Sequence, residues 1–396
     1  MRPRSHIKFL RVYPLSIPLR KAFSHAAHVR QDADPIVIQI ELADGTAGHG
    51  ETLPRPYVSG ETPESVVRTI RDEWLEGLVR LRPARFPEAM EWIAGLPTHS
   101  TAGDCVTAAR AGIELALIDA YCRHFGMPVG EVVGWFGLSG LGSPGSIGRV
   151  RYSGILSGDN PASLTRKTRL MWWYGLRDFK LKVGYEDDEQ RIRSVAQALG
   201  RSLGRTTTLR LDANGGWTLD QAIDRLRAVA DVPIACVEQP LAKSRDVDLV
   251  VLKQAVKVNV MLDESLVTLE DAQRLHGLGV LDVLNVRISK NGGFLPGLRL
   301  AHFARRNNLG CQLGCMVGET SILSAVGRRW LEQVPGASFA EGSYGRFLLS
   351  GDIAPRPVGF GLGGRPKPLP GPGWGVEPDP ALLEHYARPG VIEFPF

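Results

Sequence analysis

Residues 208–215 read TLRLDANG, residues 234–240 read IACVEQP, and residues 258–265 read VNVMLDES. Each stretch is a short apolar run with an acid at its end, and the acids Asp212, Glu238 and Asp263 stand at intervals of 26 and 25 residues. Apolar runs separated by helical segments are typical of strand–helix units in a parallel sheet. The carboxyl ends of the strands of an α/β barrel converge on one face, where such barrels hold their active sites. The spacing therefore predicts an enzyme in which three acids share one site.

The same strand–helix rhythm continues from about residue 149 to about residue 350. Helical segments such as DDEQRIRSVAQALG at 187–200 and LEDAQRLHGLG at 269–279 separate the apolar runs. Eight runs can be counted, which predicts a (β/α)8-type barrel and places the chain in the α/β class. The runs are VRYSGIL, DFKLKVG, TLRLDANG, IACVEQP, VNVMLDES, VLDVLNVRIS, LGCQLGC and SFAEGSY.

The segments on either side of the barrel pattern have a different character. Strand-like alternation at residues 7–19 and 35–45 gives way to helical patterns, which predicts an α+β unit. The chain near the C-terminus is rich in Gly and Pro but keeps several aromatic residues, so we expect it to pack against another unit. The predicted domains are residues 1–133, 134–350 and 351–396.

Composition narrows the class of partner and the compartment. The net charge of the 396 residues is only +5, and no run of Lys or Arg reaches the density of a nucleic-acid-binding patch. No apolar run approaches the ~18 residues of a membrane span. We therefore expect a small-molecule substrate, with weak preference for anions, and neither nucleic acid nor membrane. The odd count of five cysteines favours a reducing compartment, and no signal-like core follows the N-terminus, so a cytoplasmic location is expected.

The three acids offer only oxygen ligands. Carboxylates without His or Cys suit Mg²⁺, or Mn²⁺, over zinc, and Mg²⁺ commonly keeps positions for water or substrate oxygens. Asn214 and Glu264 lie beside two of the acids and add oxygen atoms at the same strand ends. The alternative is that each acid caps the helix that follows, as Asp often does. Three acids at nearly equal spacing favour the metal site.

Lysines accompany the three acids. Lys180 and Lys182 stand two residues apart in FKLKVG, so a strand points both to the same face. Two ammonium groups at that distance lower each other's pKa, which predicts a lysine tuned to act as a general base. Lys290 ends a strand nearly opposite in a barrel of eight and is expected to reach the other side of a bound substrate. The alternative for each lysine is a solvated charge or an ion pair with an adjacent acid.

With these motifs the chain resembles the enolase superfamily, in its muconate lactonizing enzyme-like subgroup. The resemblance covers nearly the whole chain and implies that an N-terminal capping domain, completed by the C-terminal tail, lies over the barrel mouth. It also implies a homo-oligomer. The barrel motifs that carry it are Lys180-Leu181-Lys182, Asp212-Ala213-Asn214, Glu238-Gln239-Pro240, Asp263-Glu264-Ser265 and Ser289-Lys290-Asn291-Gly292-Gly293. The flanking motifs are GHGETLPRPYVSGET, IELALID and GPGWGVEPD.

The resemblance implies a mechanism as well. Enolase-superfamily sites are a known case of a Lys or His base that works with Mg²⁺ to stabilise an enediolate. Mg²⁺ on the three acids is expected to bind the substrate carboxylate, whose neighbouring carbon loses a proton. Lys182 is the expected base on one face, Lys290 acts on the other, and Lys180 holds the pKa of Lys182 down. The seventh strand, LGCQLGC, is followed by no His, so the mandelate racemase-like subgroup is not indicated.

The resemblance also points to residues that would read the rest of the substrate. Lids in this family correspond here to the loops around residues 18–30 and 51–60. Asn214 and Glu264, at the strand ends, are further candidates. The candidate lid residues are His25, His28, Arg55 and Tyr57.

The chain departs from its relatives near the last strands. Dipeptide epimerases of the subgroup carry an Asp-x-Asp pair at the eighth strand, where this chain has AEGSYG with Glu341 alone, which argues against a dipeptide substrate. Glu341 and Glu319 are each candidates for pairing with a cationic nitrogen, and each could equally be a satisfied strand-end acid. Arg287 stands where relatives often carry a lysine.

A racemase or epimerase of an amino-acid-derived carboxylate is the predicted activity, because two lysines on opposite faces can remove a proton and return one from behind. A cycloisomerase or a syn-dehydratase on the same scaffold is the alternative, since each uses one lysine for the proton. A Schiff-base lyase with Lys182 or Lys290 as nucleophile is a more distant alternative that leaves the acids unexplained. The last alternative is a relative that keeps the fold but has lost catalytic activity. The presence of all three acids and all three lysines argues against it.

Overall fold

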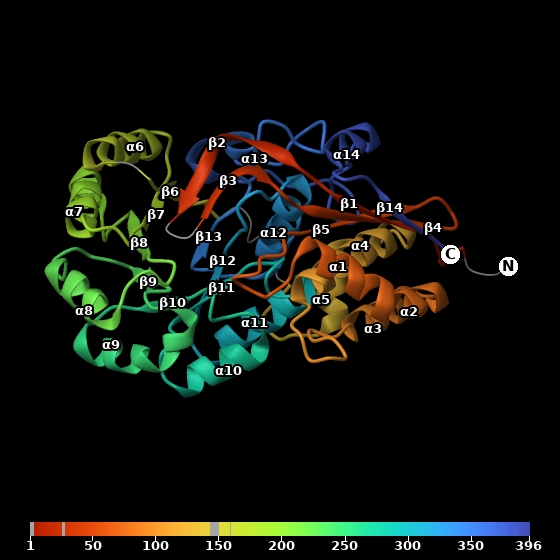
Figure 1. Cartoon of the computed structure of the whole chain (residues 1–396), viewed down its shortest axis with the longest axis horizontal. Coiled ribbons are helices and arrows are strands. Elements are labelled where there is room, and N and C mark those ends of the chain that lie inside the picture. The colour runs from red at the N-terminus through yellow and green to blue at the C-terminus, as the bar shows by residue number, and fades with distance from the viewer. Residues whose placement is uncertain (1–3, 26–27, 143–149, 159) are drawn as a thin grey trace.

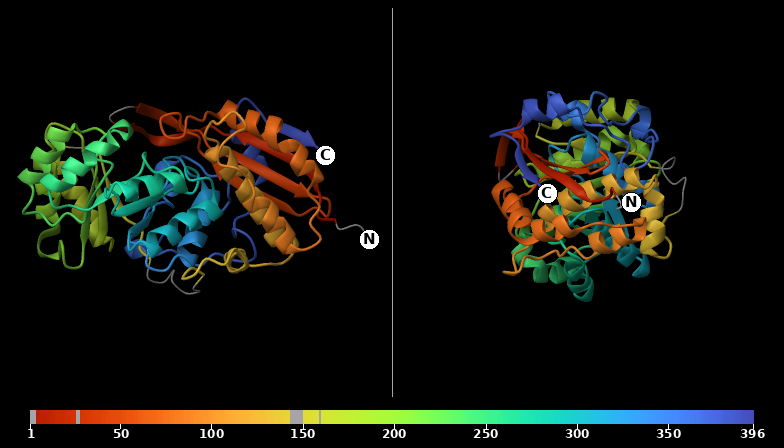
Figure 2. Two further views of the ribbon diagram at one scale, coloured as in Figure 1. Left: turned by 90° about the horizontal axis from the view of Figure 1, so that it is seen from below. Right: turned by 90° about the vertical axis from the view of Figure 1, so that its right-hand side faces the viewer.

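The computed structural model of the chain describes residues 4–25, 28–142, 150–158 and 160–396, without the side chains of residues 22–25 and 28–30 (Figure 1). The N-terminal part is a sheet with helices on one face, and it lies at one end of the barrel (Figure 2). The strands that the N-terminal part contributes to this sheet are β1 Ile7–Pro14, β4 Ile36–Leu42 and β5 Ala47–Thr52. A separate antiparallel pair is formed by β2 Ile17–His25 and β3 His28–Ala33. Its helices are α1 Pro63–Thr69, the π-helical turn η1 Ile70–Trp74, α2 Leu75–Arg80, α3 Phe86–Ala94, α4 Thr107–His124 and α5 Val129–Phe136.

The N-terminal sheet takes its edge strand from the other end of the chain. Its order is β14-β1-β4-β5 with antiparallel neighbours, and β14 spans Ile392–Pro395. The predicted turn between β4 and β5 contains Gly45, whose φ of 87° suits glycine. The C-terminal segment therefore packs on the N-terminal unit, and β14 lies beside β1 at the same end of the molecule (Figure 2).

Helix α4 presses against β5 because both elements use small residues where they meet. A Cβ at Gly48 would lie 2.1 Å from the backbone N of Ala120, and one at Gly50 would lie 2.1 Å from the backbone O of Gly112. No larger side chain fits in either place. The helix is buried on almost all sides, since it lies between this sheet and the barrel.

The remaining strands form the predicted barrel. Eight parallel strands follow one another in chain order, and each lies within one of the eight apolar runs. A parallel bridge between Tyr152 and Ala340 joins the first strand region to the last. The strands are β6 Gly154–Leu156, β7 Asp178–Lys182, β8 Thr208–Asp212, β9 Cys236–Glu238, β10 Val260–Leu262, β11 Val283–Val286, β12 Gly310–Leu313 and β13 Phe339–Ala340. The α/β-barrel prediction is confirmed.

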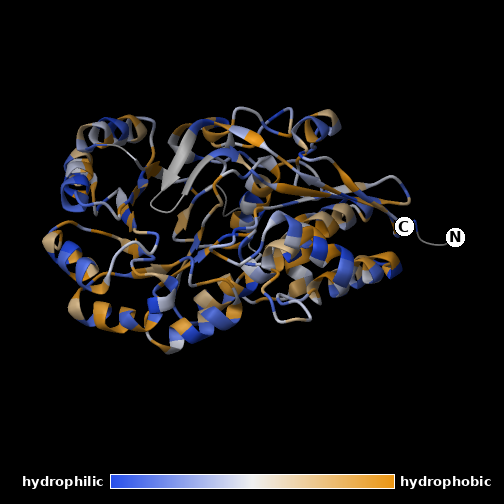
Figure 3. Cartoon of the chain, viewed as in Figure 1, coloured by the Kyte–Doolittle hydropathy of each residue, from blue (hydrophilic) through white to orange (hydrophobic). Residues whose placement is uncertain are grey.

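Amphipathic helices surround the barrel. Along them hydrophobic residues alternate with hydrophilic ones (Figure 3), as expected for helices with one face on a sheet and one in water. The helices are α6 Pro161–Trp173, α7 Asp188–Leu199, α8 Leu219–Ala228, α9 Leu249–Ala255, α10 Leu269–Gly277, α11 Phe294–Arg306 and α12 Ser321–Gln333. The short 3-10 turns are η3 Gly200–Ser202, η4 Lys243–Asp248 and η5 Leu362–Gly364. The α-helices after β13 are the single turn α13 Gly345–Leu348 and, much later, α14 Pro380–Tyr386.

Two further findings concern the chain as a whole. No helix in the described ranges is long and apolar enough to cross a membrane. All five cysteines are free thiols.

Candidate active site

The three predicted metal ligands lie side by side at the carboxyl ends of neighbouring strands. Asp212 ends β8, Glu238 ends β9, and Asp263 directly follows β10. In the parallel register Lys182, Asp212 and Glu238 form one row across β7, β8 and β9, so their side chains leave the sheet on the same side. All three acids are fully buried.

The acids do not cap the following helices. The side chain of Thr218 caps α8 by accepting a hydrogen bond from the backbone N–H of Gln221. Thr268 caps α10 in the same way with Asp271. The helix-cap alternative is therefore wrong for Asp212 and Asp263, which leaves both carboxylates for the site.

Shared cations join the three carboxylates. Lys180 Nζ lies 3.1 Å from Asp212 Oδ2 and 3.3 Å from Glu238 Oε2. Arg287 Nη2 donates to Asp263 Oδ2 and lies 3.7 Å from Glu238 Oε1. In the part of the chain that the structure describes, no three acidic, His or Cys side chains are already arranged around one metal position. Lys180 and Arg287 instead bridge the acids.

The donor set fits a hard divalent cation in its chemistry. All three donors are carboxylates, which are the ligands that Mg²⁺ prefers. Burial and the neighbouring Asp212 raise the pKa of Glu238 to about 7, because the site holds more negative charge than a buried position tolerates. Two more buried oxygens beside the acids, Glu264 Oε2 and Asn285 Oδ1, have no hydrogen-bond partner among the described residues. Buried oxygens in such a cluster are the atoms that a bound cation satisfies.

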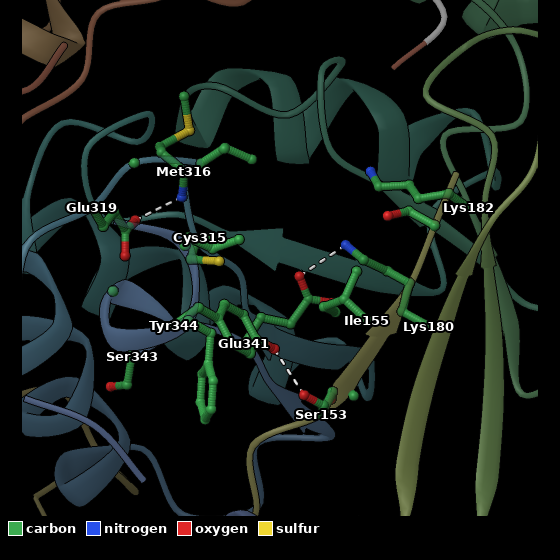
Figure 4. Close-up of a pocket in the computed structure, with 18 of the residues that line it drawn as sticks. Ser153, Ile155, Lys180, Lys182, Cys315, Met316, Glu319, Glu341, Ser343 and Tyr344 are labelled. Carbon is green, nitrogen blue, oxygen red and sulfur yellow. Dashed lines mark hydrogen bonds and ion pairs between the residues drawn. The ribbon is translucent and has the colours of Figure 1, made fainter. Parts of the chain in front are cut away.

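Lys180 and Lys182 extend from β7 to the same side, as predicted (Figure 4). Lys180 Nζ also donates to Glu341 Oε2 at 2.8 Å. Burial alone lowers the pKa of Lys180, but the carboxylates of Glu238, Glu341 and Asp212 hold it well above its ordinary value. The expectation that the two lysines lower each other's pKa is therefore wrong for Lys180, since attraction to three carboxylates exceeds the repulsion.

Lys182 is the more accessible of the pair. Its Nζ donates to Asp212 Oδ2 at 2.6 Å and to Asn214 Oδ1 at 2.7 Å. Asn214 adopts a φ of 46°, which asparagine tolerates better than most residues, and its Nδ2 donates to Glu264 Oε1 at 3.1 Å. The turn after β8 thus orients the Lys182 ammonium.

Lys290 lies behind Asp263 instead of facing the cavity. Its Nζ donates to Asp263 Oδ1 at 2.9 Å, to the backbone O of Asp263 at 2.8 Å and to that of Asn285 at 2.9 Å. Burial lowers the pKa of Lys290. Lys182 contacts Asp212 and Lys290 contacts Asp263, at the two ends of the row of acids, and only Lys182 of these two lysines lines the cavity.

Helix α4 fixes the loop that follows Lys290. The guanidinium of Arg110 donates to the backbone O of Gly292, and Glu114 Oε1 accepts from the backbone N of Leu295 at 2.9 Å. Gly293 has a φ of 117°, and a Cβ there would lie 1.4 Å from Glu114 Oε2. Only glycine fits this position, so the N-terminal unit holds the loop from behind.

A cavity of about 610 Å³ opens beside the lysines (Figure 4). The three acids and Lys290 do not line it and lie deeper. Eight predicted residues do line it, namely Arg55, Tyr57, Lys180, Lys182, Asn214, Glu264, Glu319 and Glu341.

The lid candidates differ in their placement. Arg55 is buried, and its Nη2 lies 2.9 Å from Asp34 Oδ1. Tyr57 also lines the cavity but is 43% exposed. His25 ends β2 and His28 begins β3, and the side chains of both lie outside the described part of the structure.

Glu319 is a candidate with an altered charge state. Its Oε1 accepts from the backbone N of Met316 at 2.6 Å (Figure 4). Burial raises the pKa of Glu319 to about 8, so this carboxyl is mainly protonated at pH 7. A neutral acid on the cavity wall can donate a hydrogen bond to a neutral substrate oxygen.

Sequence reasoning missed the partner that holds Glu341 from below. Arg210 is fully buried, and its Nη2 donates to Glu341 Oε1 at 3.1 Å and to Ser153 Oγ at 2.9 Å. The signal was available, because Arg210 stands two residues before Asp212 and therefore shares its face of β8. The carboxylate of Glu341 is thus shared between Arg210 and Lys180. Cys315 and Tyr344, which also line the cavity, carried no signal in the sequence.

Both parts of the chain match known family models. Residues 10–134 match the mandelate racemase / muconate lactonizing enzyme N-terminal domain, and residues 164–382 match the enolase C-terminal domain-like family. The hydrophobic dipeptide epimerase of Enterococcus faecalis is 29% identical over 319 residues, covering 80% of this chain and 84% of the relative. Muconate cycloisomerase 1 of Pseudomonas putida is 28% identical, covering 93% of this chain and 95% of the relative.

Solved structures agree. N-succinyl Arg/Lys racemase from Bacillus cereus superposes with a TM-score of 0.84 at 24% identity, covering 98% of this chain and all of that one. Muconate lactonizing enzyme from Pseudomonas putida superposes with a TM-score of 0.80 at 26% identity, covering 97% of this chain and all of that one. The chain therefore belongs to the enolase superfamily, in its muconate lactonizing enzyme-like subgroup, and is an isomerase of that superfamily.

Proposed function

We propose that the protein is a racemase or epimerase that moves the proton on the carbon next to the carboxylate of an amino-acid-derived substrate. The observation that carries this proposal is the placement of Lys182 on the cavity wall, with Lys180 beside it and three buried carboxylates beneath. Abstraction of such a proton is the chemistry of the superfamily. A homo-oligomeric state and a cytoplasmic location, both expected from the sequence, belong to the same proposal.

Asp212, Glu238 and Asp263 are the residues that would hold Mg²⁺ or Mn²⁺. Bound there, the ion would stabilise the negative charge that develops on the substrate carboxylate as the proton leaves.

The lysines divide the proton transfer between them. Lys182 accepts the proton on the cavity side, and Asn214 and Asp212 orient its Nζ through bonds of 2.7 and 2.6 Å. Lys290 returns a proton from the opposite side, for which its Nζ must leave Asp263 Oδ1. Lys180 stays paired with Glu341, so that its positive charge offsets the negative charge of that carboxylate beside the cavity.

The substrate nitrogen is expected to be uncharged. Glu341 is the acid that could meet an ammonium group, yet it already pairs with Lys180 at 2.8 Å and Arg210 at 3.1 Å. Protonated Glu319 offers a hydrogen bond and no charge. An N-acylated amino acid therefore suits the cavity better than a free amino group does. The N-succinyl-L-Arg/Lys racemase of Bacillus cereus, 26% identical over 333 residues, is a relative of this kind by name.

Cycloisomerisation is the second candidate. The muconate cycloisomerase of Pseudomonas putida aligns over 93% of this chain, against 80% for the hydrophobic dipeptide epimerase. Such a reaction, or a syn-dehydration, requires one lysine to transfer the proton. Of Lys180 and Lys182, which both line the cavity, Lys182 has the more exposed side chain, at 14% against 3%.

Mass-detected deuterium incorporation in D₂O with Mg²⁺ tests the proposal. The panel contains N-acyl amino acids, free amino acids, dipeptides, betaines and muconates. Exchange with inversion that is lost in Lys182→Ala and in Lys290→Ala, but kept in Lys257→Ala, is the expected result. Lys257 is an exposed lysine away from the cavity and serves as the matched control.

The other outcomes reassign the reaction. Ring closure or loss of water identifies a cycloisomerase or a dehydratase. Trapping by borohydride without metal identifies a Schiff-base lyase. Exchange that survives in Lys182→Ala refutes the assignment of the base.

A further inference from the structure

The barrel wall is incompletely sealed between its first and last strands. β6 pairs along its length with β7, whereas toward β13 the described structure gives one bridge, Tyr152 to Ala340, and one backbone bond, Ser153 N to Ala340 O at 2.9 Å. Above that point the connection is a side chain, since the hydroxyl of Tyr344 donates to the backbone O of Ser153 at 2.8 Å. The wall is therefore sealed at its base and spanned by a tyrosine above.

The helical layer is also thin at this seam. β13 is followed by α13, a single turn of 4 residues, whereas α6 and α12 each have 13. In place of a full helix, the tail around η5 covers the base of the seam, because Tyr152 N donates to the backbone O of Gly364 and Gly363 N donates to that of Tyr174, each at 2.8 Å. Phe360 of the same tail stacks on Tyr152, with ring centroids 5.3 Å apart.

Apolar side chains line the cavity next to this seam. Phe347 and Phe360 contact each other with ring centroids 5.7 Å apart, and Leu170 is 70% exposed. We call this region the side lobe and define it by Met171, Tyr174, Leu176, Phe347, Leu348 and Phe360, with Leu170 at its mouth.

The side lobe and the lysines belong to one cavity. The same continuous space of about 610 Å³ is lined by the side lobe and by Lys180 and Lys182. Its charged lining residues come from the barrel interior and the lid, and the side lobe contributes none. The space is in the range of pockets that bury a ligand considerably larger than a short carboxylate. The cavity thus has a charged end and an apolar end.

We infer that the side lobe binds an apolar tail of the substrate, such as an alkyl or aromatic acyl group on the nitrogen, while the carboxylate lies at Lys182. This inference rests on the proposed function and adds a substrate class to it. Water in contact with aromatic and aliphatic side chains is displaced when an apolar tail enters, and the gain grows with each buried methylene. Long-tailed acyl amino acids are therefore expected to be preferred over N-acetyl or N-succinyl ones.

Two series of compounds test the inference. Unreactive alkanoates from acetate to octanoate are titrated by calorimetry in the presence of Mg²⁺. N-acyl amino acids with the same chain lengths are compared by deuterium exchange. Each added methylene is expected to improve binding, and kcat/KM, by about fourfold until the side lobe is full.

Three variants locate the effect. Leu170→Glu and Phe347→Glu place a charge at exposed positions of the side lobe, so folding is expected to survive, and thermal melting verifies it. Both should weaken octanoate binding by tenfold or more and leave acetate unchanged. Trp173→Glu is the matched control, because Trp173 lies on the same helix, is 79% exposed and does not line the cavity. If Trp173→Glu weakens octanoate binding as much as Leu170→Glu does, the inference is wrong.

The two proposals fail in different ways. If N-acetyl substrates exchange deuterium and longer acyl chains do not raise kcat/KM, the side lobe does not bind the acyl tail, and the proposed function stands. If alkanoates bind more tightly with increasing length but no N-acyl substrate exchanges deuterium, the proposed function is wrong, and the side lobe still binds apolar chains.

Discussion

Gly293→Ala is the substitution with the most sharply defined consequence. A residue other than glycine in a sparsely populated backbone region costs about 1 to 3 kcal/mol, and Gly293 has a φ of 117°. The added Cβ would lie 1.4 Å from Glu114 Oε2, so Glu114 must move. The Glu114 carboxylate would then lose two contacts. One is the ion pair of its Oε2 with Arg110 Nη1, and the other is the hydrogen bond that its Oε1 accepts from the backbone N of Leu295, each 2.9 Å long. Arg110 and Glu114 are 1% and 0% exposed, and breaking such a buried pair costs about 3 to 5 kcal/mol.

The free energy of unfolding is therefore expected to fall by about 4 kcal/mol or more in Gly293→Ala. Urea unfolding, followed by tryptophan fluorescence, measures the fall. Gly45→Ala is the control, because Gly45 also has a positive φ, of 87°, but a Cβ added there would meet no atom within 4 Å. It should cost only the backbone term, about 1 to 3 kcal/mol, without the loss of the buried ion pair. Equal unfolding midpoints for the two variants would refute the claim that Glu114 is locked behind the loop.

Three further predictions concern the charges of the site. Arg210→Met leaves Glu341 buried without its lower partner and should lower the free energy of unfolding by about 3 to 5 kcal/mol, and a second change, Glu341→Gln, should restore part of the loss in the same urea assay. Because the pKa of Glu319 is raised from 4.5 to about 8, the folded protein holds this proton more tightly than the unfolded chain, so the contribution of Glu319 to stability falls as pH rises from about 4.5 to 8. Glu319→Gln should therefore gain about 2 to 4 kcal/mol over the native protein across that window, seen as a growing difference in Tm, and a constant difference would contradict it. Mg²⁺ at about 100 times its Kd should raise the free energy of unfolding by about 2.7 kcal/mol, EDTA should reverse the shift, and an equal shift in Asp263→Asn would place the ion elsewhere.

The strands and the row of acids could be predicted because both follow from spacing. Each apolar run contains one strand of the barrel. Because side chains alternate between the two faces of a strand, the position of Asp212 in its run determines the face to which its side chain points. The pairing of Lys180 with Lys182 on one face followed from the same period of two. These features depend on local chain geometry, which sequence shows directly.

Side-chain reach and long-range packing could not be predicted. Lys290 turns to Asp263 and Arg287 bridges two acids because of torsions along flexible side chains, which no spacing encodes. The raised pKa of Lys180 depends on Glu238 and on Glu341, and Glu341 follows β13, 161 residues along the chain from Lys180. The side lobe combines segments from both ends of the barrel and the tail. Arg210 is the exception, since its position on the face of Asp212 was visible in the sequence.

The pairing of β1 with β14 bears on how the protein is made. Arg11 and Glu393, which pair across these strands, are 382 residues apart. At a synthesis rate of about 5 to 20 residues per second, β1 leaves the ribosome roughly 20 to 80 seconds before its partner. During that interval the growing chain presents an unpaired strand edge, of the kind that recruits other strands. Slower translation lengthens the exposure, so codon choice and growth temperature should influence the yield of folded enzyme more strongly than the barrel alone would suggest.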